Sequence, residues 1–234
     1  MWLLRLTFMS MIKHHHLSII FRVSVLILLV TALLPSCKST TAISSSSPAH
    51  SRPSVAPPEF SEADRAYADV YKVLDGTWKG DFIIYEDTQP RSLDEIDLKS
   101  LTQEHIKVPS IREINRINVT QVYSSESPYF QRVKITDYYP DSGKEEISTG
   151  VNKVENGMMW CIVNKPSETI IHEGSTPSPN TIIWQSHQDS PQKIEYFQET
   201  VSADFYEIIG YGYYVGDDAT VSPRLWFYSK YERQ

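Results

Sequence analysis

Ten stretches rich in β-branched and aromatic residues follow one another from Trp78 to the end of the chain, and this succession limits the possible folds most. Val, Ile, Thr and aromatic residues favour strands, while Gly, Pro, Asn, Asp and Ser between the stretches favour turns. We expect strands at residues 77–86, 113–123, 129–138, 144–152, 156–163, 167–173, 180–187, 192–201, 203–215 and 223–232. Eight to ten strands with short hairpin loops predict an all-β fold, an antiparallel up-and-down β-barrel, because closure removes exposed strand edges.

Two segments of this domain have the residue spacing of helices. Apolar residues recur at helical intervals from Ser61 to Leu74, and Gly76 follows as a stop signal. In the long connection between the first two strands, Ser92-Leu93-Asp94-Glu95 has the spacing of a capping box. We therefore expect a short N-terminal helix and a second helix over 93–105. The second would be a lid over one open barrel end, or a surface elaboration that plugs it.

Residues 1–36 have the organisation of a secretory signal peptide. Three basic residues and no acid accompany an uncharged apolar stretch, Val23–Leu34, which is followed by Pro35 and Ser36. The apolar stretch is roughly 12 residues long, whereas a membrane-spanning helix needs about 20. We expect this leader to be removed, and an uncleaved anchor helix is the alternative.

The sequence Leu34-Pro35-Ser36-Cys37 resembles a bacterial lipobox. In proteins with this motif the cysteine becomes the first residue of the mature chain and is acylated, so Cys37 is the expected lipidation site. Several acyl chains hold a protein on a membrane almost permanently. Lys38, in place of Asp, resembles the outer-membrane sorting pattern of enteric-type bacteria. These features predict a lipid-anchored protein of the bacterial cell envelope, on the outer membrane and facing the periplasm or the surface.

The predicted organisation has three parts. Residues 1–36 are the signal peptide, residues 37–60 are the lipidated cysteine and a disordered Ser/Pro-rich tether, and residues 61–234 are the barrel domain. The leader contains three of the 22 basic residues and none of the 29 acidic ones, so its removal changes the formal charge from −7 to −10. Such an acidic domain is not expected to bind nucleic acid. With Cys37 acylated, Cys161 has no disulfide partner and is expected to be a buried, inert thiol.

The stretch Leu74-Asp75-Gly76-Thr77-Trp78-Lys79-Gly80 resembles the opening of lipocalin-like (calycin) barrels, and more closely that of nitrobindin-type barrels. In those families the tryptophan plugs one barrel end near an arginine of the last strand, which implies Arg224 or Arg233 here. Nitrobindin-type proteins bind haem through a histidine near the C-terminus. No histidine follows His187, so haem binding is not implied and we expect no cofactor.

Strand alternation predicts which side chains face the barrel interior. The residues expected to line a ligand pocket are Trp78, Phe82, Ile84, Gln131, Val133, Trp160, Trp184 and Tyr196. An aromatic lining with a few polar groups is typical of small-molecule sites. We therefore expect a membrane-tethered protein that binds a small apolar or amphipathic ligand. The alternative is a solidly packed barrel that is an envelope protein–protein interaction module, with an unknown protein partner.

Signatures of an enzyme are weak. The chain has no nucleophile elbow, P-loop, dinucleotide fingerprint or zinc-protease motif. His172 and His187 flank one predicted hairpin, but its register separates them by roughly 20 Å at ~3.4 Å per residue, too far to share a metal. We expect no catalytic residues and no metal site, and an activity on a bound lipid is only a third hypothesis.

Overall fold

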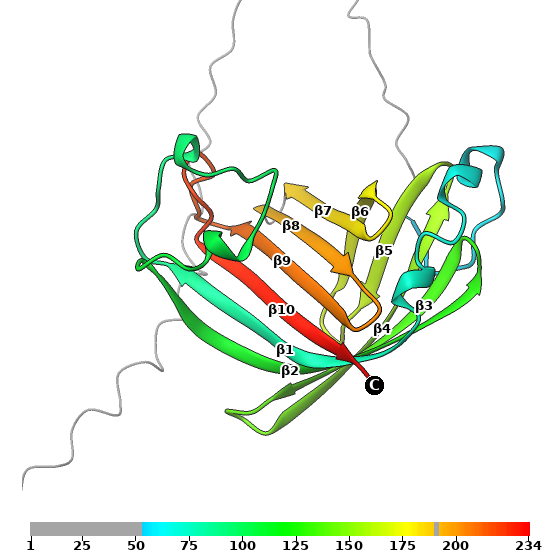
Figure 1. Ribbon diagram of the computed structural model, residues 1–234, viewed down its shortest axis with the longest axis horizontal. Helices are drawn as coiled ribbons and strands as arrows, with labels where there is room; N and C mark the ends of the chain where they lie inside the picture. Colours follow the sequence, from blue (N-terminus) through cyan, green and yellow to red (C-terminus); the bar gives the residue numbers. More distant parts are fainter. Residues whose placement is uncertain (1–52, 190–191) are drawn as a thin grey trace, which may run out of the picture. The chain divides into compact units, whose positions relative to one another are not determined.

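The computed structural model describes residues 53–189 and 192–234. Within them, ten strands form a closed barrel in which each strand pairs antiparallel with its neighbours in sequence and β10 pairs with β1 (Figure 1). The strands are β1 (Gly76–Asp87), β2 (Ile111–Ser127), β3 (Phe130–Tyr139), β4 (Lys144–Glu155), β5 (Met158–Asn164), β6 (Thr169–Ser178), β7 (Thr181–Asp189), β8 (Gln192–Val201), β9 (Phe205–Tyr214) and β10 (Leu225–Arg233). Short 3-10 helices accompany them: η1 (Glu62–Tyr67), η2 (Lys72–Leu74), η3 (Leu93–Glu95) and η4 (Gln103–His105). The expected all-β antiparallel up-and-down barrel is confirmed, with ten strands.

Most predictions for the first part of the chain lie outside the described residues. They concern the signal peptide 1–36, the lipidation site Cys37 and most of the tether 37–60. The described end of this region contains neither helix nor strand, and the ring of Phe60 lies 5.3 Å from that of Tyr129. Among the described residues, no helix is both long enough and apolar enough to cross a bilayer.

The segment before β1 forms η1 and η2 in place of the single helix that we expected. Asp69, between them, has a φ of +59°, a left-handed conformation that interrupts a regular helix. Its amide donates to the Pro128 carbonyl at 2.8 Å, which ties the bend to the β2–β3 turn. Because of this bend the chain turns inward, and Tyr71 and Leu74 are buried inside one end of the barrel.

The connection between β1 and β2 also differs from the prediction. It contains η3 and η4 in place of one helix over 93–105, and it lies against the outer wall of the barrel rather than over an end. Ile96 and Leu101 of this connection are buried in one cluster with Tyr196, Ile209 and Trp226 from the outer faces of β8, β9 and β10. The outer faces of these three strands are therefore apolar at these positions because the connection covers them.

The barrel interior contains the main core. Residues paired across neighbouring strands point to the same side of the wall, so the pairing of Gly80 with Tyr231 and of Tyr231 with Tyr206 brings them together inside. On β1, the inward positions are Trp78, Phe82 and Ile84, as alternation predicts.

Two glycines of the inner wall lie beneath aromatic rings. A Cβ on Gly174 would stand 2.4 Å from the Trp184 ring, and one on Gly210 would stand 2.6 Å from the Phe197 ring. Each glycine thus lets a ring from the next strand lie close against the wall.

Candidate functional site

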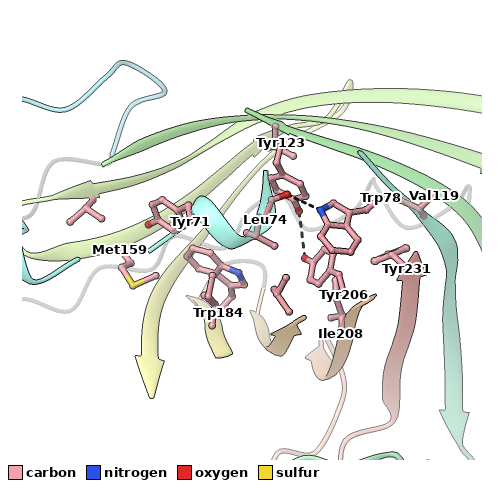
Figure 2. Packing of buried hydrophobic residues seen from close by; sticks show 14 of the residues in the cluster. Tyr71, Leu74, Trp78, Val119, Tyr123, Met159, Trp184, Tyr206, Ile208 and Tyr231 are labelled. Atoms are coloured by element: carbon pink, nitrogen blue, oxygen red, sulfur yellow. Dashed lines mark hydrogen bonds between the residues drawn. The ribbon is translucent and has the colours of Figure 1, made fainter. Parts of the chain in front are cut away.

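One end of the barrel is closed by Tyr71, Leu74 and Trp78, which we name the plug (Figure 2). Trp78 has no accessible surface, and its indole N–H donates to the Leu74 carbonyl at 2.7 Å. The Tyr71 hydroxyl donates to the Lys153 carbonyl at 2.8 Å, and its ring stacks with that of Trp184 at 6.2 Å between centroids. We call this the closed end, because these contacts leave no room for a ligand.

Arg233 of β10 covers the plug. Its guanidinium lies over the Trp78 indole, with Cζ 4.2 Å from the ring centroid, and it donates to the Asp75 carbonyl. Gly76 makes room for it: its φ is +121°, and a Cβ there would stand 2.8 Å from Nη1 of the arginine. Of the two arginines that the family resemblance implied beside the tryptophan, Arg233 occupies this place and Arg224 does not.

The side chain of the fully buried Gln131 is hydrogen-bonded to the segment that contains the plug. Its amide donates to the Tyr71 carbonyl at 2.8 Å and to the Asp75 carboxylate at 2.9 Å. Its carbonyl accepts a hydrogen bond from Asn152 at 2.9 Å. Gln131 therefore positions the segment that closes the barrel, rather than offering a free polar group to a ligand.

Beyond the closed end, the interior of the barrel is accessible, and we call this part the open half of the lumen. Several inward-facing apolar side chains there are only half-buried: Phe82, Ile84, Ile135, Cys161 and Phe197. A side chain that points inward in a closed barrel is accessible only where the lumen admits solvent. The lumen is therefore filled at the closed end and incompletely filled beyond it.

Aromatic rings line the open half in a continuous row. The rings of Phe82 on β1 and Phe227 on β10 lie 5.7 Å apart, and those of Phe227 and Phe197 lie 5.4 Å apart. The row ends at His172 of β6, whose ring lies 5.6 Å from that of Phe197. These rings offer an apolar molecule a contact surface that extends across part of the lumen wall.

Glu199 of β8 is a buried carboxyl on the lumen side of the wall, and Trp184, which stacks on Tyr71 of the plug, is one of its hydrogen-bond partners. Burial raises the pKa of its carboxyl to about 7, and hydrogen bonds with Tyr206 and Trp184 offset part of that effect. A carboxyl that is protonated below neutral pH can donate as well as accept a hydrogen bond. Glu199 thus places one adaptable polar group among apolar and aromatic neighbours.

A second polar group, which we call the Glu195 cluster, lies toward the other end of β8. His172 Nε2 and Lys193 Nζ each lie 3.2 Å from Glu195 Oε2, and the Tyr214 hydroxyl donates to Oε1 at 2.8 Å. Burial opposes the charge on Glu195, but these contacts outweigh it and hold the pKa of the carboxyl below its ordinary value. The His172 contact has the distance of an ion pair without the alignment of a hydrogen bond.

Cys161 faces the lumen between Asn152 of β4 and His172 of β6. Burial raises the pKa of its thiol well above the ordinary value, so the reactive thiolate is scarce at neutral pH. The raised pKa agrees with the expectation of an inert thiol, although the side chain is half-buried rather than fully buried. In the part of the chain that the structure describes, no group of three or more His, Cys, Asp and Glu side chains is arranged to hold a metal ion.

The residues predicted to contact a ligand divide into three sets. Those that face the lumen are Trp78, Phe82, Ile84, Gln131, Val133 and Trp184. Of these, only Phe82 and Ile84 belong to the accessible open half, and the others are buried toward the closed end. The prediction is wrong for Trp160 and Tyr196, which point outward.

Both errors have the same physical cause. Apolar alternation identifies the inner face of a strand only where the outer face is polar. Trp160 lies on a part of the outer wall that is itself apolar, and Tyr196 lies beneath the β1–β2 connection. The inward residues of β8 are Glu195, Phe197 and Glu199, and two acids in alternation resemble a solvent-facing pattern.

Sequence reasoning also left the inner face of β9 and β10 unassigned. Gly210 and Gly212 were the available signal, because glycines two positions apart mark a face on which rings of neighbouring side chains can lie. Gly210 pairs with Phe197 of β8 and with Phe227 of β10, so both phenylalanines lie on the same face of the wall as this glycine and point into the lumen.

No protein-family profile matches the chain, and no curated protein matches it. Solved structures do match. The crystal structure of Rv2717c from M. tuberculosis has 16% sequence identity and a TM-score of 0.44, over 75% of this chain and 99% of that chain. The structure of EF1p2_mFAP2b bound to DFHBI has 12% identity and a TM-score of 0.35, over 72% and 99%. The class of the protein, a closed ten-stranded antiparallel barrel, rests on its own strand pairing.

Proposed function

We propose that this protein is a lipid-anchored envelope protein that binds a small apolar or amphipathic molecule inside its barrel. The observation that carries the proposal is the contrast along the lumen: Trp78 has no accessible surface, whereas Phe82 and Phe197 are only half-buried. A barrel that was only a scaffold would pack its whole interior to the density of a protein core. Contact with the aromatic row at ~25 cal/mol per Å² of buried apolar area would provide most of the binding free energy.

The anchor part of the proposal rests on the sequence. The leader 1–36 ends in a lipobox-like motif, and acylation of Cys37 would keep the barrel beside a membrane. Amphipathic molecules are plentiful there. The resemblance of the segment 74–80 to the opening of lipocalin-like barrels supports a ligand-binding role as well.

The purified protein is expected to bind Nile red and dansyl-labelled undecanoic acid, and the emission of both probes rises as they leave water. Ile84→Trp adds a large ring in the accessible half and should weaken binding by about tenfold, which is ~1.4 kcal/mol. Fluorescence titration measures the change in Kd.

Ile147→Trp is the matched control for Ile84→Trp. Ile147 is 48% exposed on the outer wall of β4, so the same substitution there should leave the Kd unchanged. Failure of the unchanged protein to bind either probe would contradict ligand binding and favour the interaction module with a solid barrel. Equal effects of the two tryptophans would show that the probes bind elsewhere.

Cys37→Ala is expected to move the full chain from the membrane fraction to the soluble fraction of expressing cells, because the acyl chains need the thiol. Cys161→Ala removes the other cysteine and should leave the protein in the membrane fraction. Immunoblots of the two fractions measure the distribution. Retention of Cys37→Ala on the membrane would favour an uncleaved anchor helix.

A further inference from the structure

The strand pairing of the barrel wall is interrupted between β6 and β7. The two strands pair from Glu173 and Gln185 toward the closed end. Beyond that point, within the described residues, no strand pairing joins Thr169–His172 of β6 to Ser186 and His187 of β7. Both segments remain paired on their other sides, with β5 and with β8. We call this interruption the seam.

A pocket of about 440 Å³ lies in the seam. Ile170, Ser186 and Lys193 line it from inward-facing positions, whereas Trp160 and His187 line it from outward-facing ones. The pocket is thus lined by both edges of the interruption and by Lys193 of β8, whose position in the strand faces the lumen. Its volume lies in the range of small-molecule sites.

The seam pocket is polar, whereas the lumen behind it is aromatic. Glu168 and Glu173 contribute carboxylates from the β6 side, and Lys193 contributes an ammonium group from β8. Beside the seam, the buried His172 holds Nε2 3.2 Å from Glu195 Oε2, and its ring touches the first ring of the aromatic row, Phe197. A molecule with donors and acceptors at one end and an apolar chain at the other matches this arrangement.

Resting on the proposed function, we propose that single-chain zwitterionic lipids enter the barrel laterally, through the seam, and keep their polar group in the seam pocket. The chain then lies along the row from Phe197 to Phe82, while the cationic and anionic parts of the head group meet Glu168, Glu173 and Lys193. An unpaired seam exposes two strand edges, which closed barrels otherwise avoid. Lateral access explains the interruption, because it lets the head group stay in contact with water while the apolar chain moves from water into the lumen.

The test covers the seam after the protein has folded. His187→Cys places a thiol on the exposed outer side of the seam, and a biotin group is attached to it through a disulfide and covered with streptavidin. The association rate of pyrene-labelled lysophosphatidylcholine, followed by stopped-flow fluorescence, should fall by about tenfold or more. Dithiothreitol removes the cover and should restore the rate. The full chain is used throughout, and every variant also carries Cys161→Ala, so that the half-buried thiol of Cys161 is not labelled.

Val122→Cys is the matched control, since Val122 is 40% exposed on the outer wall of β2, away from the seam. With the same cover, this variant should bind the lipid at the rate of the uncovered protein. Equal association rates for the two covered variants would overturn lateral entry and leave binding in the lumen intact. Absence of binding to the uncovered protein would overturn the proposed function, and lateral entry with it.

The position of the head group is tested by comparison with a pyrene-labelled alkane of the same length. The lysolipid should bind the uncovered protein about tenfold more tightly than the alkane, because only the lysolipid has groups that meet the polar seam. The substitutions Glu173→Gln and Lys193→Met should reduce this preference without weakening alkane binding. Equal affinities for lysolipid and alkane would overturn the assignment of the head group to the seam pocket.

Discussion

Replacement of Trp78 by Ala is expected to lower the free energy of unfolding by ~3–5 kcal/mol, the usual loss for a fully buried aromatic residue. Trp78 has no accessible surface, meets Tyr206 edge-on at 5.7 Å and lies beneath the guanidinium of Arg233. Its indole also holds the Leu74 carbonyl. The truncation would leave a cavity at the closed end and an unpaired carbonyl beside it. Urea unfolding followed by circular dichroism measures the loss.

Trp160→Ala is the matched control for the plug. Trp160 is also a strand tryptophan, but it is half-buried on the outer wall, so its truncation should cost only about 1 kcal/mol. The ratio of the two losses in unfolding free energy, Trp78→Ala over Trp160→Ala, is therefore informative even if both variants are less stable than expected. Similar losses for Trp78→Ala and Trp160→Ala would contradict the role assigned to the plug.

Glu199→Gln is expected to stabilise the protein by ~2–3 kcal/mol near pH 8 and to change little near pH 5. Burial raises the pKa of Glu199 to about 7 in the folded protein, against an ordinary value of 4.5. Between these two values the folded state binds more protons than the unfolded state, so the stability of the unchanged protein falls as the pH rises. Glutamine keeps a carbonyl for Tyr206 or Trp184 and has no charge to desolvate.

Glu195→Gln is the matched control on the same strand and the same inner face. Its neighbours hold the pKa of Glu195 below the ordinary value, so its charge contributes stability that is present above that value and is lost as the pH falls. Glu195→Gln should therefore destabilise the protein near pH 8 and matter less in acid. Thermal unfolding at both pH values separates the two carboxyls. Parallel pH profiles for the two variants would contradict the different environments assigned to Glu195 and Glu199.

The strands were predictable because each one carries its own local signal. Residues 192–201 were expected and are the bounds of β8, and the turn at Asn156-Gly157 has the positive φ values that those residue types tolerate. The motif at Gly76-Thr77-Trp78 was equally informative, because its glycine and its tryptophan both meet one residue, Arg233. Local chemistry thus determines the number of strands and the plug.

The remaining features depend on contacts between distant segments. Asp69 bends the chain because a carbonyl of the β2–β3 turn accepts its amide, and no residue near it signals that contact. The β1–β2 connection covers Tyr196 and Trp226. The outward positions of these strands are therefore apolar, and alternation cannot distinguish them from the inward positions. The seam is invisible in the sequence, since β6 and β7 read as an ordinary hairpin and differ from one only in where their pairing stops.

Both ends of the barrel domain lie at the closed end. The ring of Phe60 meets Tyr129 in the β2–β3 turn, and the amide of Gln234 donates to the carbonyl of Thr77 at 2.9 Å. A fluorescent protein fused after Gln234 would therefore be attached at the blind end, away from Thr169–His172 of β6. This geometry suits the domain to use as a sensor, because a reporter attached at the closed end would leave the opposite end of the barrel uncovered.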